Sequence, residues 1–84
     1  MPTVSIRYWA GARAAAGMDA EVIQAETVAT ALRIARDRHA DPRFDRVLEA
    51  SSLLLDGVAL HPADLEAQLV QDARVEVLPP FAGG

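Results

Sequence analysis

Two stretches of alternating apolar and polar residues lie near opposite ends of this chain, and they constrain its fold more than any other feature. In "TVSIRYW" (Thr3 to Trp9) every second residue is apolar, and "RVEVL" (Arg74 to Leu78) alternates in the same way. A period of two is typical of a strand with one buried face. Because 84 residues have room for one hydrophobic core, both strands are expected to belong to one small domain.

The residues after the first strand predict a second strand and one amphipathic helix. The segment "AGARAAAG", residues 10–17, is rich in alanine and glycine and predicts a turn or a short helical connection. The segment "DAEVIQA", residues 19–25, resumes the alternation and favours an antiparallel hairpin with the first strand. Thr27 is a suitable N-cap for a helix over Val28–His39, whose apolar residues share one face.

The second half of the chain predicts three short elements. Pro42 disfavours helical backbone in the residue before it, so the helix ends there, and residues 43–50 predict a short helical turn. Residues 52–60, "SLLLDGVAL", are typical of two short strands about an Asp56-Gly57 turn, which is a strong hairpin signal. A loop over residues 61–69 then leads towards the last strand.

The order strand, strand, helix, strand, strand, strand favours an α+β domain in which one mixed sheet packs on one main helix. This arrangement and the size of the chain suit a β-grasp, in which the first and last strands lie side by side in the centre of the sheet. Pro79 and Pro80 have no backbone N–H and end the last strand. We therefore expect a β-grasp domain over residues 1–78 and an extended tail over residues 79–84.

The outward residues near the ends of the two central strands are expected to be neighbours. Trp9 and Leu78 are out of phase with the buried residues of their strands, and Phe81 follows three positions after Leu78. The sequence thus predicts an exposed apolar patch at the root of the tail, and such patches mark partner sites. The alternative is that a bulge turns Trp9 into the core.

Charge and composition argue against several functions. A formal net charge of -4 disfavours nucleic acid and favours partners with basic docking faces. The chain has no cysteine, and its two histidines, His39 and His61, lack the spacing of metal ligands. No apolar run approaches the ~20 residues of a membrane span, and no secretion signal is present. We therefore expect a cytoplasmic protein that binds no metal, no nucleic acid and no membrane.

Two motifs resemble a known family, the ubiquitin-like sulfur carriers, and most closely its molybdopterin synthase small-subunit branch. The segment "LPPFAGG", Leu78 to Gly84, is similar to the family's apolar residue, two prolines, two variable residues and terminal Gly-Gly. In "WAGAR", Trp9 and Ala10 match an aromatic and a small residue of the family, and Arg13 matches its usual arginine.

Two departures from the family pattern concern the partner surface rather than the fold. Ala14 stands where the family often has glutamate, and "QDAR", residues 71–74, replaces its common Gly-Asp turn.

The resemblance implies that the carboxylate of Gly84 is the reactive group, which an ATP-dependent enzyme adenylates and then converts into a thiocarboxylate. Gly83 and Gly84 lack Cβ atoms, so they can enter a narrow channel and adopt backbone angles closed to other residues. The two prolines favour an extended direction that lowers the entropy lost on threading, and Phe81 can anchor the tail. The residues implied to contact partners are Trp9, Arg13, Leu78, Pro79, Pro80, Phe81, Ala82 and Gly83.

The implied function is the delivery of sulfur in molybdenum cofactor biosynthesis, as the small subunit of molybdopterin synthase. The implied partners are the large catalytic subunit and a ubiquitin-activating-type adenylating enzyme. No cofactor is expected to bind stably, since ATP is used by the activating enzyme, and the chain is not an enzyme alone. Two alternatives stay open: a sulfur carrier for cysteine, thiamine or tRNA thiolation, and a ubiquitin-like modifier or binding module.

Overall fold

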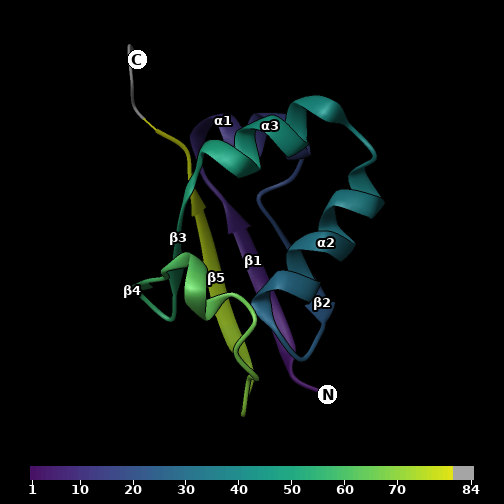
Figure 1. Cartoon of the computed structure of the whole chain (residues 1–84). Helices are drawn as coiled ribbons and strands as arrows, with labels where there is room; N and C mark the ends of the chain where they lie inside the picture. The colour runs from purple at the N-terminus through teal and green to yellow at the C-terminus, as the bar shows by residue number, and fades with distance from the viewer. Residues whose placement is uncertain (81–84) are drawn as a thin grey trace.

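The structure, a computed structural model, describes residues 1–80, and this range contains five strands and three α-helices (Figure 1). A single 3₁₀ turn, η1, lies in the loop before the last strand. In chain order the elements are β1 (Thr3–Tyr8), α1 (Ala10–Ala16), β2 (Ala20–Gln24), α2 (Val28–His39), α3 (Pro42–Ala50), β3 (Ser52–Leu55), β4 (Val58–Ala59), η1 (Pro62–Asp64) and β5 (Ala73–Leu78).

The strands form one mixed sheet in the order β2-β1-β5-β3-β4. Strands β1 and β5 pair in parallel, with Tyr8 opposite Val77, whereas the other neighbouring pairs are antiparallel. The predicted sheet, with the first and last strands side by side at its centre, is confirmed. Because these two strands are parallel, the segments that follow them begin at the same end of the sheet.

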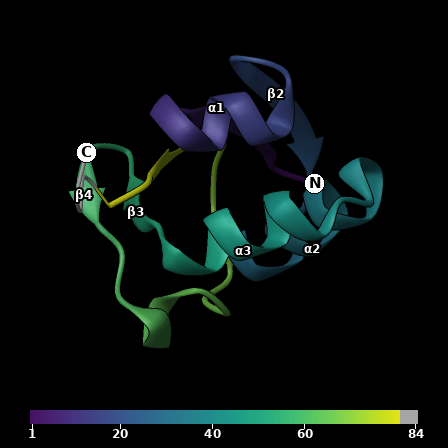
Figure 2. The same cartoon turned by 90° about the horizontal axis from the view of Figure 1, so that it is seen from above.

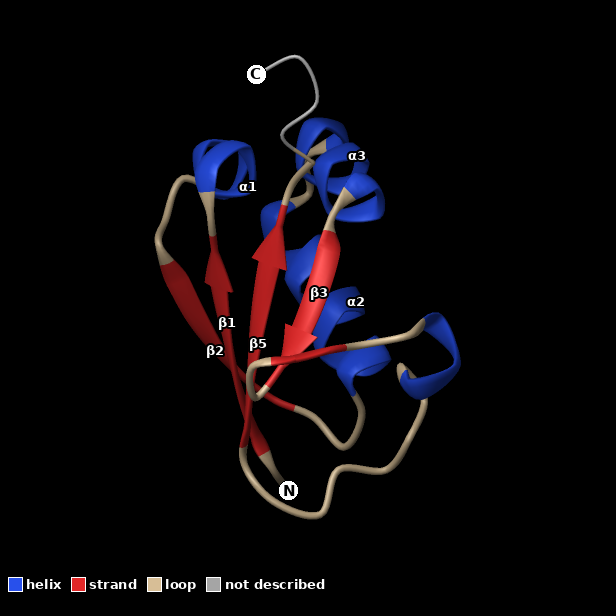
Figure 3. Ribbon diagram, turned by 90° about the vertical axis from the view of Figure 1, so that its left-hand side faces the viewer, coloured by secondary structure: helices blue, strands red, loops and turns tan. Residues whose placement is uncertain are grey.

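The hydrophobic core lies between one face of the sheet and the helices (Figure 3). The inward residues of the central strands are almost completely shielded from solvent, as their alternation predicts. Burying such a side chain stabilises the fold by roughly 1.5–3 kcal/mol relative to leaving it exposed. These residues are Val4, Ile6, Tyr8, Val75 and Val77.

Helix α2 begins at the predicted residue. The hydroxyl of Thr27 accepts a hydrogen bond from the backbone N–H of Thr30 at 3.0 Å, which satisfies one of the amides left free at a helix start. The helix ends at Ala40, whose φ of 49° is left-handed. Its buried face comprises Val28, Ala31 and Ala35, while Leu32 is half-buried.

The predicted short helical connection over residues 10–17 is helix α1, whereas the short helical turn predicted over residues 43–50 is a longer helix, α3. The first, α1, ends at Gly17, whose φ of 72° suits a residue without a Cβ atom. The second, α3, has nine residues rather than one turn. The carboxylate of Asp41 caps it by accepting from the backbone N–H of Arg43 at 2.9 Å, and Pro42 occupies the start of the helix, where no N–H is needed. Helices α1 and α3 contact each other at the end of the sheet where β1 and β5 finish (Figures 1 and 2).

The predicted hairpin of β3 and β4 is confirmed, although β4 has only two residues. Asp56 and Gly57 have φ values of 49° and 85°, and two successive left-handed residues are typical of a type I′ turn. The carboxylate of Asp56 also accepts a hydrogen bond from the backbone N–H of Arg74 at 2.9 Å. This bond ties the turn to the central strand β5.

Candidate partner-binding site at the root of the tail

The end of the sheet at which β1 and β5 finish brings together the predicted partner residues that the structure describes. The backbone N–H of Trp9 donates to the carbonyl of Val77 at 3.2 Å, which continues the β1–β5 pairing by one step. Trp9 therefore lies beside the end of β5, where Leu78 is the last strand residue. The proximity that the sequence predicts for Trp9 and Leu78 follows from this register.

Trp9 is exposed, so the alternative in which a bulge turns it into the core is wrong. Its side chain is 40% accessible to solvent, whereas the preceding Tyr8 is buried. The indole Nε1 donates a hydrogen bond to the carboxylate of Glu76 at 3.1 Å, and the guanidinium carbon of Arg7 lies 5.5 Å from the ring centroid. A cation at this distance is attracted by the face of the ring. The indole is thus held on the outer face of the sheet.

Leu78 and Pro79 are half-buried and Pro80 is exposed, so the described tail residues are not covered by the core. Leu78 lies opposite Ser52 of β3, and the strand pairing ends there. We call Arg7, Trp9, Glu76, Leu78 and Pro79 the tail-root surface. The predicted site residues Phe81, Ala82, Gly83 and Gly84 lie outside the described residues.

Arg13 lies in the last turn of α1, the short helix that starts directly after Trp9. The backbone N–H of Arg13 donates to the carbonyl of Trp9 at 3.3 Å, so the two residues are fixed relative to each other. The guanidinium of Arg13 lies 3.8 Å from the carboxylate of Asp19, and both side chains are largely exposed. A solvent-exposed pair of this kind contributes little to stability, which leaves the guanidinium available to a partner.

Two members of the tail-root surface, Arg7 and Glu76, were not among the residues selected from the sequence. Arg7 carries a local signal, because it lies two positions before Trp9 and so shares its strand face. Glu76 carries none, because it is 67 positions away from Trp9 and comes near only through the β1–β5 register. Together they add a positive and a negative group to an apolar surface, a composition suited to binding another protein.

A second polar cluster lies behind the tail-root surface and was also not predicted. The hydroxyl of Tyr8 donates to Glu21 Oε2 at 2.6 Å, and His39 Nε2 lies 2.6 Å from the same oxygen. The Glu21 side chain is only 9% exposed, and a guanidinium nitrogen of Arg38 approaches its other oxygen at 3.5 Å. The His39 ring packs on Phe44 with centroids 4.3 Å apart. The cluster joins β1, β2, α2 and α3.

The ionisation of this cluster follows from its burial and hydrogen bonds. Burial raises the pKa of the Glu21 carboxyl, but the hydrogen bonds from Tyr8 and His39 outweigh it and hold that pKa below its usual value. Burial, together with the bond to Glu21, raises the pKa of the Tyr8 hydroxyl well above its usual range. Glu21 is therefore an ionised acceptor and Tyr8 a neutral donor at neutral pH.

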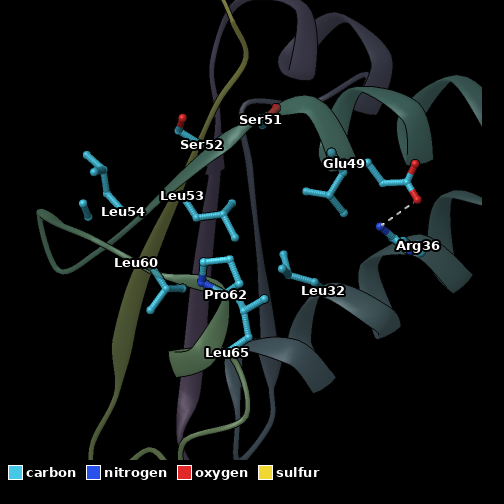
Figure 4. Close-up of a pocket in the computed structure, with 12 residues that line it drawn as sticks. Leu32, Arg36, Glu49, Ser51, Ser52, Leu53, Leu54, Leu60, Pro62 and Leu65 are labelled. Atoms are coloured by element: carbon cyan, nitrogen blue, oxygen red, sulfur yellow. Dashed lines mark ion pairs between the residues drawn. The ribbon is translucent and has the colours of Figure 1, made fainter.

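An apolar pocket of about 430 Å³ opens on the helix side of β3 (Figure 4). An ion pair at its rim joins Arg36 and Glu49 at 3.9 Å. Residues 1–80 contain no group of three His, Cys, Asp or Glu side chains that could hold a metal ion. Within the same range, no helix has the length and apolar character needed to span a membrane.

Comparison with known proteins defines the fold class. No protein-family model matches this sequence, and no curated protein sequence matches it. Among solved structures, small archaeal modifier protein 1 from Methanosarcina acetivorans superposes with a TM-score of 0.82 at 24% identity, over 100% of this chain and 98% of that one. The same modifier from Haloferax volcanii gives a TM-score of 0.78 at 20% identity, over 98% of this chain and 99% of that one.

A third similar structure is a protein–protein complex of subunits 1 and 2 of the molybdopterin-converting factor from Helicobacter pylori 26695. Its TM-score is 0.68 at 18% identity, over 98% of this chain and 99% of that one. This chain thus has the β-grasp fold of ubiquitin-like proteins. The structural neighbours are of the kind that the sequence motifs resemble, and the similarity spans each chain almost from end to end.

Proposed function

We propose that this protein is a sulfur carrier that is activated at the carboxylate of Gly84 and acts as the small subunit of a molybdopterin synthase. The observation that carries the proposal is the joining of "LPPFAGG" to the end of the central strand β5, beside an exposed tryptophan. A reactive end needs a rigid support and an adjacent docking surface, because binding energy must hold it in a partner's active site. The tail-root surface offers both.

The partners supply ATP, the adenylating active site and the sulfur donor, so the carrier itself needs only the carboxylate of Gly84. A carboxylate resists nucleophiles because of its charge. Its oxygen attacks the α-phosphorus of ATP, pyrophosphate leaves, and the resulting acyl adenylate has a good leaving group. A persulfide sulfur of the sulfur-donating partner then attacks the acyl carbon and displaces AMP, which leaves an acyl disulfide. A thiol of the partner attacks the S–S bond, forms a disulfide with the partner's sulfur, and releases the thiocarboxylate of Gly84. The large subunit would accept that sulfur for the pterin precursor.

The experiment that tests the proposal is a mass measurement on the intact protein. Incubated with its adenylating enzyme, ATP and a persulfide donor, the chain should gain the mass of one oxygen-to-sulfur exchange, located on Gly84. One residue added after Gly84, or deletion of Gly84, should abolish the gain, because the carboxylate then misses the adenylation centre. Gly83→Val should be nearly as harmful because it adds bulk and removes conformational freedom. These changes leave β5, which ends at Leu78, untouched.

A second candidate function is a ubiquitin-like protein modifier, favoured by the similarity to the two modifier structures. In that case Gly84 would form an isopeptide bond with a lysine of another protein. Protein purified from its native cell separates the two functions. A thiocarboxylate at Gly84 supports the carrier, whereas Gly84 found only in isopeptide bonds replaces the carrier with the modifier.

A further inference from the structure

Every basic residue of this chain other than histidine is an arginine. The 84 residues contain eight arginines and no lysine, and they contain no cysteine. The chain therefore has neither a side-chain amine nor a thiol, the two groups that most readily take an acyl group from an activated carboxyl. We propose that no side chain of this protein can capture its own activated end, so that an acyl group on Gly84 is transferred to another molecule rather than within the chain. This inference rests on the proposed activation of Gly84.

The reaction that the composition prevents is a simple acyl transfer. A neutral lysine amine attacks the carbonyl of an acyl adenylate or thioester, an N–C bond forms, and the bond to the leaving AMP or thiolate breaks. The amine loses its proton to solvent and a stable amide remains. A guanidinium stays protonated at neutral pH, with a pKa above about 12, and has no free electron pair for this attack. Arginine thus provides the charge of lysine without its nucleophile.

This distinction matters most next to the tail. Arg7 is exposed, lies opposite Glu76 in the β1–β5 register, and is on the same strand face as Trp9. The six residues that follow Leu78 span at most about 20 Å when fully extended. That reach includes the surroundings of Arg7, two positions back along the sheet. A lysine at position 7 would therefore lie within range of an activated Gly84.

Serine and threonine hydroxyls, including the exposed Ser52 opposite Leu78, attack an acyl group only when a neighbouring base takes their proton. The remaining amine, imidazole and phenol groups of the described chain are shielded, distant or give no stable product. His39 is 10% exposed and bound to Glu21, and the Tyr8 hydroxyl is buried in the same cluster. His61 is exposed, but an acyl group on imidazole is readily hydrolysed, which restores the carboxylate. An α-amino group at Met1 lies at the opposite end of the sheet from Leu78 (Figure 1). Distance does not exclude the exposed Met1 amine of a second copy, so the inference concerns transfer within one molecule.

The test uses a thioester made chemically at Gly84 of the full chain, with 2-mercaptoethanesulfonate as the leaving thiol, so no activating enzyme is needed. At pH 8 and a low protein concentration, where two copies seldom meet, the wild-type thioester should only hydrolyse. Arg7→Lys keeps the charge but adds an amine, and it should lose its thioester at least about tenfold faster, because a tethered amine acts at a millimolar effective concentration. Its product should be an internal amide, lighter than the hydrolysed protein by one water.

A matched variant places the amine at the far end of β5. Gln71 is exposed and lies seven positions before Leu78, which is about 23 Å along an extended strand. Only a fully extended tail brings Gly84 near this position, so the Gln71→Lys thioester should form an internal amide more slowly than the Arg7→Lys thioester does. Circular dichroism should show that both variants fold like the wild type.

The outcomes separate this inference from the proposed function. An internal amide from the wild-type thioester would overturn the inference, and so would an Arg7→Lys thioester as inert as the wild type. Neither result bears on whether an adenylating enzyme and a persulfide donor produce a thiocarboxylate. If no thiocarboxylate forms with the adenylating enzyme and the persulfide donor, the proposed function is overturned, while the thioester result still holds.

Discussion

Trp9 is held by polar neighbours on the outer face of the sheet, whereas Tyr8, one residue earlier, is completely enclosed. The indole N–H bonds to Glu76 at 3.1 Å and Arg7 lies over the ring, so the side chain has a defined position although it is 40% exposed. A large aromatic group held in one orientation loses little entropy when a partner covers it. This preorganisation makes Trp9 the residue expected to contribute most to docking among those described.

The first prediction concerns that residue. Trp9→Ala should weaken binding to the large subunit of the proposed molybdopterin synthase by about 2 kcal/mol or more, as truncation of a hot-spot tryptophan commonly does. The fold should persist, because the core lies on the other face of the sheet. Isothermal calorimetry measures the affinity and urea unfolding the stability. The control is Val70→Ala, which truncates a 92% exposed side chain before the start of β5. Equal affinities for the two variants would show that the docking surface lies elsewhere.

At the scale of elements, the cluster around Glu21 joins strands β1 and β2 to the end of helix α2. Tyr8 and His39 both bond to one carboxylate oxygen at 2.6 Å. Because the His39 ring also packs on Phe44, the cluster fixes the corner between α2 and α3. Helix α3 lies at the end of the sheet from which the tail leaves (Figure 1). By holding α3 in place, the cluster supports the tail-root surface from the core side.

The second prediction is a dependence of stability on pH. The pKa of Glu21 is lower in the folded than in the unfolded chain, so the unfolded chain binds the proton first as pH falls. The stabilisation is complete above the carboxyl's usual pKa of about 4.3 and is lost as pH falls through the lower folded value. Glu21→Gln should reduce the free energy of unfolding at pH 7 by about 1–3 kcal/mol, because a nearly buried hydrogen-bonded group is lost.

Urea unfolding at pH 7 and at pH 3 checks this dependence. The free energy of unfolding should change less between pH 7 and pH 3 for Glu21→Gln than for the wild type. Glu66→Gln serves as the control, since Glu66 is exposed and lies outside the helices and strands. The free energy of unfolding of Glu66→Gln should change with pH as much as that of the wild type. If the stability of Glu21→Gln depends on pH as strongly as that of the wild type, these contacts do not lower the pKa of the Glu21 carboxyl.

At the scale of the whole molecule, the balance of charge is expected to govern how partners meet this protein. The formal net charge is -4 over 84 residues. Charge of this kind acts over distance and accelerates the encounter with a basic surface, whereas apolar burial acts only after contact. The tail-root surface and the net charge should therefore affect different steps of binding.

The third prediction separates these two steps. The association rate with the large subunit should fall as salt rises from low to physiological concentration, because ions screen charges beyond about 8–10 Å. Stopped-flow fluorescence of Trp9 can follow the reaction. Leu78→Ala should raise the dissociation rate and keep the salt dependence of association. An association rate that does not change with salt would exclude electrostatic steering by this protein.

The sequence by itself determined the features that depend on residues a few positions apart. The alternation of Val4, Ile6 and Tyr8 identifies a buried strand face because successive side chains point to opposite sides. The cap at Thr27 and the turn at Asp56-Gly57 follow from local hydrogen bonds and backbone angles. These local elements, in their order, were sufficient for the β-grasp.

Only the tertiary structure decided the features that depend on register between distant segments. Trp9 is held in its exposed position by a hydrogen bond to Glu76, which is 67 positions away. The buried cluster forms because Glu21 contacts Tyr8 of β1 and His39 of α2. The length of α3 was underestimated because Pro42 can end one helix and begin another, and its effect depends on the cap that Asp41 supplies. No local pattern encodes such contacts, because the pairing of the strands and the packing of the helices create them.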